Sequence, residues 1–315
     1  MIGSSFRERV LPLASLLAIS ILLAIAAPEF LSQDNLLDVL RRGSAVAIAA
    51  VGMTLVIVMG EIDLSVGSVV ALSGVVGALV AKAGAPVELA IAAGIGCGAL
   101  AGALNGLLVT RLGISSFIVT LGTLSALRGL TLELTSGVAV GGLGESYPRI
   151  ASDVAGPLSV PLLLCVAVAV LAAVLMRRTA FGRHVQAIGS NRVAAELCGI
   201  RVDRTRVVVF TMAGALAGLA GMIVSAIVIS GSPTAAEGLE LDVIAAVVIG
   251  GASLQGGVGT IGGSLIGAAL MQVLANGSSL VGIDDFIQKI VTGGVIVAAA
   301  AFDVYRRRWR LTSNQ

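Results

Sequence analysis

Two acidic side chains between long apolar runs are the residues best placed to do chemistry in this 315-residue chain. Glu61 and Asp63 lie in the sequence GEIDLSVGS, residues 60–68. Ionised groups next to hydrocarbon are costly and are usually retained for a function, such as lining a polar pathway or contacting a gate. The alternative is structural, because Asp63, Ser65 and Ser68 can accept the free N–H groups of a helix that begins near Val66. The sequence is compatible with both roles.

Three more polar side chains interrupt or end apolar stretches. Arg128 lies inside FIVTLGTLSALRGLTLELT, where a guanidinium must find a carboxylate, backbone carbonyls or water. We expect a buried acid to pair with it, and direct contact with a sugar or an anion is the alternative. Asn105 and Asn276 suit either a hydrogen bond between helices or a polar lining. The candidates for a pathway or gate are therefore Glu61, Asp63, Ser65, Asn105, Arg128 and Asn276.

The residues that catalysis would need are missing from the sequence. A single histidine, His184, cannot build a zinc site, and neither HExxH nor GxSxG occurs. A phosphate-binding loop needs Gly-Lys-Ser/Thr, but the only lysines, Lys82 and Lys289, follow Ala81 and Gln288. We therefore predict that the chain is not an enzyme and binds no cofactor or metal, so that any ATP used is hydrolysed on another polypeptide.

The elements that position these residues are apolar helices. Mean hydropathy is +1.04, 57% of residues are hydrophobic and 12% are charged, which predicts an all-α integral membrane protein. We expect one domain, residues 1–315, in which 242–256 and 259–276 form a hairpin that does not fully cross. The first span is expected to be retained rather than cleaved as a signal peptide. About ten transmembrane helices are predicted, at 10–28, 43–60, 66–83, 87–109, 116–134, 157–176, 207–230, 242–256, 259–276 and 286–304.

Glycines recur at a spacing that predicts close packing between helices. Every fourth residue stays on one side of a helix, so a row of glycines makes a stripe where another backbone can approach. Residues 56–72 and 247–263 also share a Gly/Ser-rich interruption of apolar sequence, a weak repeat of the kind that discontinuous helices produce. The two glycine rows are Gly94, Gly98, Gly102 and Gly106, and Gly259, Gly263 and Gly267.

Residues 177–206, the basic loop, form a polar stretch in an otherwise apolar chain. They hold seven of the twenty Lys and Arg residues and the single histidine. With ten spans, fourteen basic residues fall on the side of this loop and of both termini, and six fall elsewhere. Positively charged loops stay in the cytoplasm, so we expect the basic loop and both termini to be cytoplasmic.

A short helix is predicted inside the basic loop. Gly189-Ser190-Asn191 is a turn with an N-cap residue, Arg192–Cys198 favours a helix, and Gly199 ends it. The small side chains of Ala194 and Ala195 would let this helix seat in a groove of a partner protein. The alternative is a loop that binds anionic lipid head groups.

Residues 189–200 resemble the coupling segment of ABC importer permeases of the ribose, galactose, arabinose and xylose type, with the pattern G-x-N-x-x-A-A-x-x-x-G-I. Residues 50–74, 102–132 and 233–277 are similar to other conserved regions of that family, so the resemblance covers most of residues 36–303. Departures are few: Glu61 stands where many members have Gly or Ser, and Cys198 stands where Ser is common. Among these departures, Glu61 is the one that we expect to alter gating or substrate preference.

The resemblance implies a type II-like ABC importer permease of a bacterial inner membrane that imports a monosaccharide or a sugar-like solute. It implies a second permease copy or homologue, two ATP-binding subunits that use ATP-Mg, and an extracytoplasmic solute-binding protein, all in membrane lipid and without nucleic acid. Another small solute, such as a branched-chain amino acid, a nucleoside or a sugar-derived signal, is the alternative. The residues implied to couple to the ATP-binding subunits are Gly189, Asn191, Ala194, Ala195, Glu196, Gly199 and Ile200.

Overall fold

The computed structural model describes residues 2–156, 158–284, 286–295, 297–298 and 301, and describes side chains from residue 12 onward. The described residues form a helical bundle with one short hairpin of strands, β1 (Asp153–Ala155) and β2 (Leu158–Ser159), and two 3-10 helices, η1 (Pro28–Leu31) and η2 (Tyr147–Ala151). The α-helices are α1 (Ile2–Ala26), α2 (Gln33–Val58), α3 (Val66–Lys82), α4 (Val87–Leu112), α5 (Ser116–Thr135), α6 (Val160–Arg178), α7 (Ala180–Ser190), α8 (Arg192–Leu197), α9 (Val202–Ile227), α10 (Leu239–Ile249) and α11 (Ile261–Leu280).

Short polar side chains decide where several of these helices begin. Ser32 accepts the Asn35 N–H at the start of α2, and Thr260 accepts the Gly263 N–H at the start of α11. Ser159 does the same for α6. Each cap satisfies one of the backbone donors that the first helical turn leaves unpaired.

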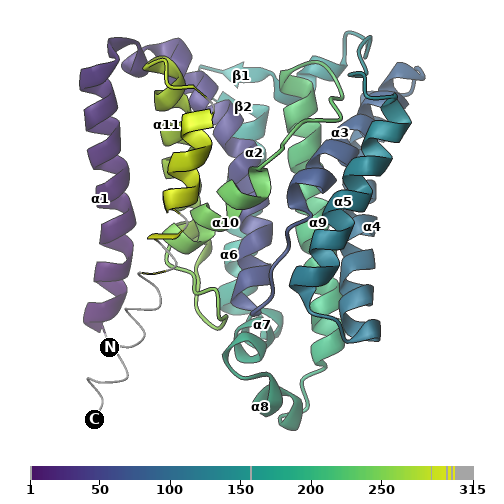
Figure 1. Ribbon diagram of the computed structural model, residues 1–315, viewed down its shortest axis with the longest axis vertical. Coiled ribbons are helices and arrows are strands. Elements are labelled where there is room, and N and C mark those ends of the chain that lie inside the picture. Colours follow the sequence, from purple (N-terminus) through teal and green to yellow (C-terminus); the bar gives the residue numbers. More distant parts are fainter. Residues whose placement is uncertain (1, 157, 285, 296, 299–300, 302–315) are drawn as a thin grey trace.

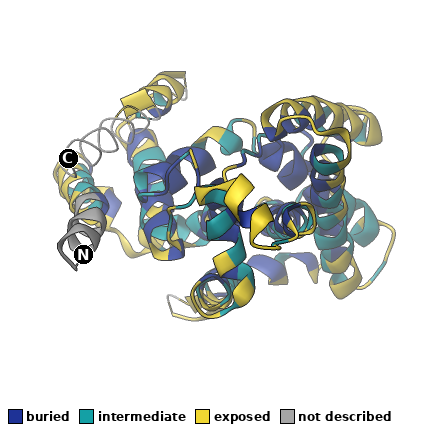
Figure 2. Cartoon of the chain, turned by 90° about the horizontal axis from the view of Figure 1, so that it is seen from below, coloured by how far each residue is buried: buried dark blue, intermediate teal, exposed yellow. Residues whose placement is uncertain are grey.

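The two most central of the long helices are α2 and α9 (Figure 1). Helix α4 packs along α9, α5 packs on α3, and α6 packs on α2. On the other flank, α11 packs on α2 and α10, and α1 packs on α11. Seen from below, buried residues fill the middle of the bundle and exposed residues lie mainly on the outer helices (Figure 2). The outward apolar side chains of α1, α4 and α6 suit contact with lipid.

The glycine row of α4 confirms the predicted close packing. Gly98 and Gly102 lie against the backbone of α9 around Phe210 and Gly214, so that a Cβ at either position would overlap α9 backbone atoms. On the other flank, Gly267 of α11 lies against the carbonyl of Ala246 in α10. Without side chains between them, the backbones come close enough for extensive van der Waals contact.

Fewer helices than predicted are long enough to span a membrane. Within the described residues, six meet the length and composition of a span, namely α2, α4, α5, α6, α9 and α11. Helix α3 and Pro12–Ala26 of α1 are shorter apolar helices, and α10 has only 11 residues. The predicted span at 286–304 lies partly outside the described residues. The count of ten transmembrane helices is therefore not confirmed.

Irregular segments account for the short helices. We call residues 59–65 the first break, 228–238 the second break and 250–260 the third break. We call the end of the molecule where the basic loop lies the basic end. The first break begins there, reverses the direction of the chain and leads to α3 (Figure 1). The second break descends from the opposite end to α10 near the middle. Each break requires residues that tolerate positive φ, such as Gly60 (83°) and Gly238 (87°).

The opposite end carries η2 and the strand hairpin. Tyr147 is 1% exposed and its hydroxyl makes a 2.7 Å hydrogen bond with the Ser225 hydroxyl of α9. Burial raises the pKa of the Tyr147 phenol, so the side chain stays neutral. An ion pair of 2.6 Å between Arg41 of α2 and Asp153 of β1 ties the hairpin to the bundle.

The packing of α4 on α9 predicts that Gly98→Val strongly lowers the thermal unfolding midpoint of the detergent-purified protein. The added side chain would occupy the space of the Gly214 carbonyl, and overpacking costs about 1–3 kcal/mol or more. Gly96→Val is the matched control, because no heavy atom of the described residues outside the local helix lies within 4 Å of a Cβ there. Equal midpoints for the two variants would contradict the close helix contact.

Candidate functional site

The basic loop folds into two short helices that protrude from the basic end (Figure 1). The predicted helix is present as α8, and the Asn191 side chain accepts the Ala194 N–H at 3.0 Å. Gly199, with φ of 81°, follows it as expected. The prediction of a turn at 189–191 was wrong in part, because Gly189 and Ser190 form the last turn of α7, a helix that the sequence interpretation missed.

The outward face of α8 is apolar. Val193 is 67% exposed and Leu197 is 84% exposed, and their spacing of four places both on the same side of the helix. Ala194 is also exposed, but Ala195 is only 4% exposed and packs into the chain's own core. Ala195 therefore seats α8 on this protein rather than on a partner. The sequence interpretation named the alanines and missed Val193 and Leu197, although helical spacing marks them as a pair.

The remaining predicted residues of this segment support α8. Glu196 accepts a hydrogen bond of 2.9 Å from Arg192, one turn away, and both side chains are about half exposed. An exposed pair of this kind contributes roughly 0.3–0.5 kcal/mol. The Ile200 N–H donates to the Ala195 carbonyl at 3.1 Å, which closes the end of α8.

Gly189 holds the basic loop against two of the breaks. A Cβ at Gly189 would overlap the Val58 carbonyl and crowd the Gly257 nitrogen. The Gly257 N–H donates to that same Val58 carbonyl at 2.8 Å, and Gly256 lies against Gly60. The two segments of the weak internal repeat thus meet at the point where α7 ends. Only glycine allows the three backbones to come this close.

Glu61 forms a buried ion pair with Arg206 in the first turns of α9. Glu61 Oε1 accepts from Arg206 Nε at 2.6 Å and from Nη2, and the two side chains are 9% and 12% exposed. Removing one partner of such a pair typically costs about 3–5 kcal/mol, because the other charge is left buried and unpaired. In this conformation Glu61 binds the first break to α9.

Asp63 takes the structural role at the start of α3. Its Oδ1 accepts from the Ser65 N–H at 2.8 Å and from the Ser65 hydroxyl at 2.6 Å. Asn105 of α4 donates to the same hydroxyl at 2.8 Å. All three side chains are almost fully buried. The prediction that Ser65 itself caps α3 was wrong, because its side chain accepts no N–H of that helix.

Helix α5 satisfies backbone groups of the first break. The Ser116 hydroxyl accepts the Ile62 N–H at 3.1 Å, and the Thr120 hydroxyl accepts the Leu64 N–H at 3.0 Å. One turn further, the Leu124 carbonyl accepts from the hydroxyl of Ser68 at 2.8 Å. The bonds to Ile62 and Leu64 replace ones that a continuous helix would have made, and the bond from Ser68 joins α3 to α5.

Arg128, one turn beyond Leu124 on α5, binds the second break. Its Nη1 donates to the carbonyls of Pro233 at 2.7 Å and Ala235 at 2.9 Å. The expected ion pair with a buried acid was wrong, since these carbonyls take the place of a carboxylate. Residues 116, 120, 124 and 128 lie four apart, so one stripe of α5 binds both breaks. We call these four positions the α5 stripe.

Asn276 serves to join helices. It donates to Asn35 at 2.8 Å, and Asn35 donates back to it at 3.1 Å, linking α11 to α2. This reciprocal amide pair is one of the two roles that the sequence left open for Asn276.

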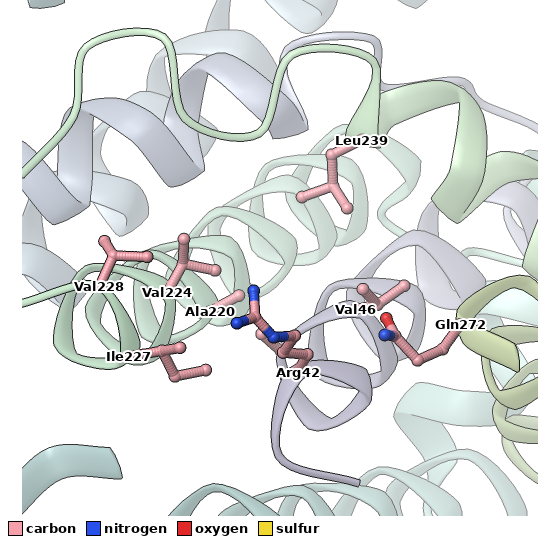
Figure 3. Close-up of a pocket in the computed structure, with 9 residues that line it drawn as sticks. Arg42, Val46, Ala220, Val224, Ile227, Val228, Leu239 and Gln272 are labelled. Atoms are coloured by element: carbon pink, nitrogen blue, oxygen red, sulfur yellow. The ribbon is translucent and has the colours of Figure 1, made fainter. Parts of the chain in front are cut away.

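A pocket of about 180 Å³ lies between α2, α9, α10 and α11 (Figure 3). A hydroxyl-rich solute needs several converging polar groups, which this pocket does not offer. Besides Arg42 and Gln272, its lining is aliphatic, namely Ala45, Val46, Ala220, Val224, Ile227, Val228 and Leu239.

Comparison with known proteins places the chain in a family. The model of the branched-chain amino acid transport system / permease component family matches residues 35–300. The ribose import permease protein of Bacillus subtilis (strain 168) is 41% identical over 298 residues, covering 94% of this chain and 92% of the relative. The L-arabinose ABC transporter permease protein of Azospirillum brasilense is 38% identical over 288 residues, covering 91% and 85%.

A third relative extends the comparison to another sugar. The xylose transport system permease protein of Haemophilus influenzae (strain ATCC 51907 / DSM 11121 / KW20 / Rd) is 35% identical over an alignment of 362 residues, covering 93% of this chain and 96% of the relative. The resemblance seen in the sequence is confirmed. The chain, a multi-pass membrane protein, therefore belongs to the family of branched-chain amino acid transport system permease components.

Proposed function

We propose that this chain is the permease subunit of an ATP-driven importer for a monosaccharide. The observation that carries the proposal is the capped helix α8 at the basic end, with exposed Val193 and Leu197, in a chain whose relatives are permeases for ribose, L-arabinose and xylose. Apolar side chains pointing into water are unfavourable for a monomer and are typical of a protein interface.

Each end of the molecule binds a different partner protein. Two copies of the permease, or one copy and a homologue, enclose the pathway, and an ATP-binding subunit docks on α8 of each. A solute-binding protein docks at the opposite end, near η2 and the strand hairpin. ATP-Mg is bound by the ATP-binding subunits, and the permease itself binds no cofactor. The whole chain acts as one transmembrane domain.

The structure suggests how force reaches the bundle. Movement of α8 by its partner displaces α7 and the start of α9, which contact the first and third breaks directly. Interdigitated helices move as rigid bodies between discrete arrangements rather than bending continuously. The close packing of α4 on α9 lets the pair rotate together. Alternating access then follows from ATP-driven rotation of one group of helices against the other.

Sugar import is the first test of the proposal. The permease, co-expressed with its ATP-binding subunit and binding protein in cells lacking their own pentose importers, is expected to take up at least one of radiolabelled ribose, L-arabinose and xylose. Leucine represents the alternative solute class and is not expected to accumulate. Uptake of leucine without uptake of any sugar would overturn the assignment of substrate class.

Leu197→Asp is expected to weaken docking of the ATP-binding subunit by about 2 kcal/mol or more, roughly thirtyfold in Kd, because a charge replaces an interface anchor. Co-purification of the two subunits measures the effect. Val154→Asp is the matched control, since Val154 is 59% exposed on β1 at the opposite end. Equal co-purification of both variants would remove α8 from the proposed interface.

Cys198 provides a test of orientation. It is exposed directly after α8, whereas Cys165 is buried and Cys97 is partly buried in helices. A membrane-impermeant maleimide should label Cys198 in inside-out vesicles, and the bound ATP-binding subunit should slow that labelling several-fold. Cys198→Ser identifies the background signal. Labelling in right-side-out vesicles would contradict a cytoplasmic basic loop and, with it, the proposed cytoplasmic termini.

A further inference from the structure

We infer that Arg206 is a positioning residue which, through Glu61, transmits movement of the basic loop to α5 and to both of the breaks that α5 holds. The inference rests on the proposed function and adds to it a route inside the permease.

The first step of the route is the stiff connection from α8 to α9. After α8, the Ile200 N–H donates to Ala195 at 3.1 Å and the Val202 N–H donates to Ile200 at 2.9 Å. Ala195 and Val202 are both 4% exposed, so both ends of the connection are packed into the core. Because this connection has little slack, a displacement of α8 moves the first turns of α9, where Arg206 lies.

The second step is the ion pair itself. Both guanidinium nitrogens that contact Glu61 share the single oxygen Oε1, and the pair is nearly excluded from water. Separating the two charges inside the bundle would leave both without compensation, so the pair stays formed while its two elements move. Arg206 therefore pulls or pushes the first break directly.

The third step passes from the first break to α5. Ile62, the residue after Glu61, donates to Ser116, and Leu64 donates to Thr120. The α5 stripe then continues to Arg128, which holds the carbonyls of Pro233 and Ala235 in the second break. A helix transmits displacement along its length, so the two breaks shift together when α5 moves.

The other ion pairs in the described part of the chain are poor transmitters. Arg41–Asp153 and Arg42–Asp38 lie toward the opposite end, with at least one partner of each well exposed. Arg192 contacts Glu196 and, at 4.0 Å, Asp203, but all of these side chains are exposed and lie within the basic loop itself. Among the described residues, Glu61–Arg206 is the buried pair that joins the basic loop to a break.

The test compares coupling in variants of the full transporter, purified with its ATP-binding subunit and reconstituted with its binding protein. Glu61→Gln is expected to assemble and to hydrolyse ATP at a rate within about twofold of wild type. Sugar uptake should fall at least tenfold, so that the ATP hydrolysed per sugar imported rises at least fivefold. The sugar is whichever of ribose, L-arabinose and xylose the wild-type complex imports.

Two further variants make the result specific. The double variant Glu61→Arg with Arg206→Glu restores an opposite-charge pair and should recover most of the coupling. Arg204→Gln removes a neighbouring exposed arginine that forms no ion pair within the described residues, and the ratio of ATP hydrolysed to sugar imported should equal that of wild type. If Glu61→Gln does not assemble, the ATP hydrolysed per sugar imported by the double variant is compared with that of Arg204→Gln, and this comparison decides whether the ion pair transmits movement.

In one contradicting outcome, Glu61→Gln loses assembly, ATP hydrolysis and uptake in parallel, while the ATP hydrolysed per sugar imported by each assembled complex stays unchanged. This result would overturn the inference and leave the pair a purely structural contact. A double variant that assembles but stays uncoupled would also overturn it. By contrast, a wild-type complex that imports none of the sugars would defeat the proposed function itself, which separates the two failures.

Discussion

The structure depends on satisfying the backbone of three helix breaks inside an apolar bundle. A peptide N–H or carbonyl that loses its helical partner in hydrocarbon costs several kcal/mol unless another group replaces it. Here the replacements are specific: hydroxyls of α5 for the first break, a guanidinium for the second, and a carbonyl of α2 for the third. The breaks survive because neighbouring helices carry the right polar atoms at the right turn.

The same requirement explains where the polar residues of an otherwise apolar chain occur. Glu61, Asp63, Asn105 and Arg128 are all engaged at or beside a break, with partners from a different part of the sequence or from the next turn. Irregular backbone at depth is a feature of transporters, because it places polar groups where a solute must pass. The polar side chains of this network therefore hold the backbone of the breaks in place.

The molecule contains two kinds of region, closely packed helix pairs and a projecting basic loop. The glycine contacts between α4 and α9, and between α10 and α11, bring the paired backbones into close van der Waals contact. The basic loop, in contrast, is seated on the bundle through Gly189 and Ala195 and turns an apolar edge outward. A permease that is driven by separate ATP-binding subunits requires closely packed helix pairs joined to a projecting helix.

Features that follow from local chemistry could be predicted from the amino-acid sequence. Hydropathy predicts the apolar helices, glycine spacing predicts the α4 stripe, and Asn191 with Gly199 bounds α8, since each signal depends on neighbours within a few residues. Three outcomes could be seen only in the folded chain: Glu61 pairs with Arg206, 145 positions away, Arg128 binds carbonyls, and Ala195 faces inward. Those outcomes depend on which helices meet, and hydropathy and spacing within one segment carry no information about the partner across the bundle.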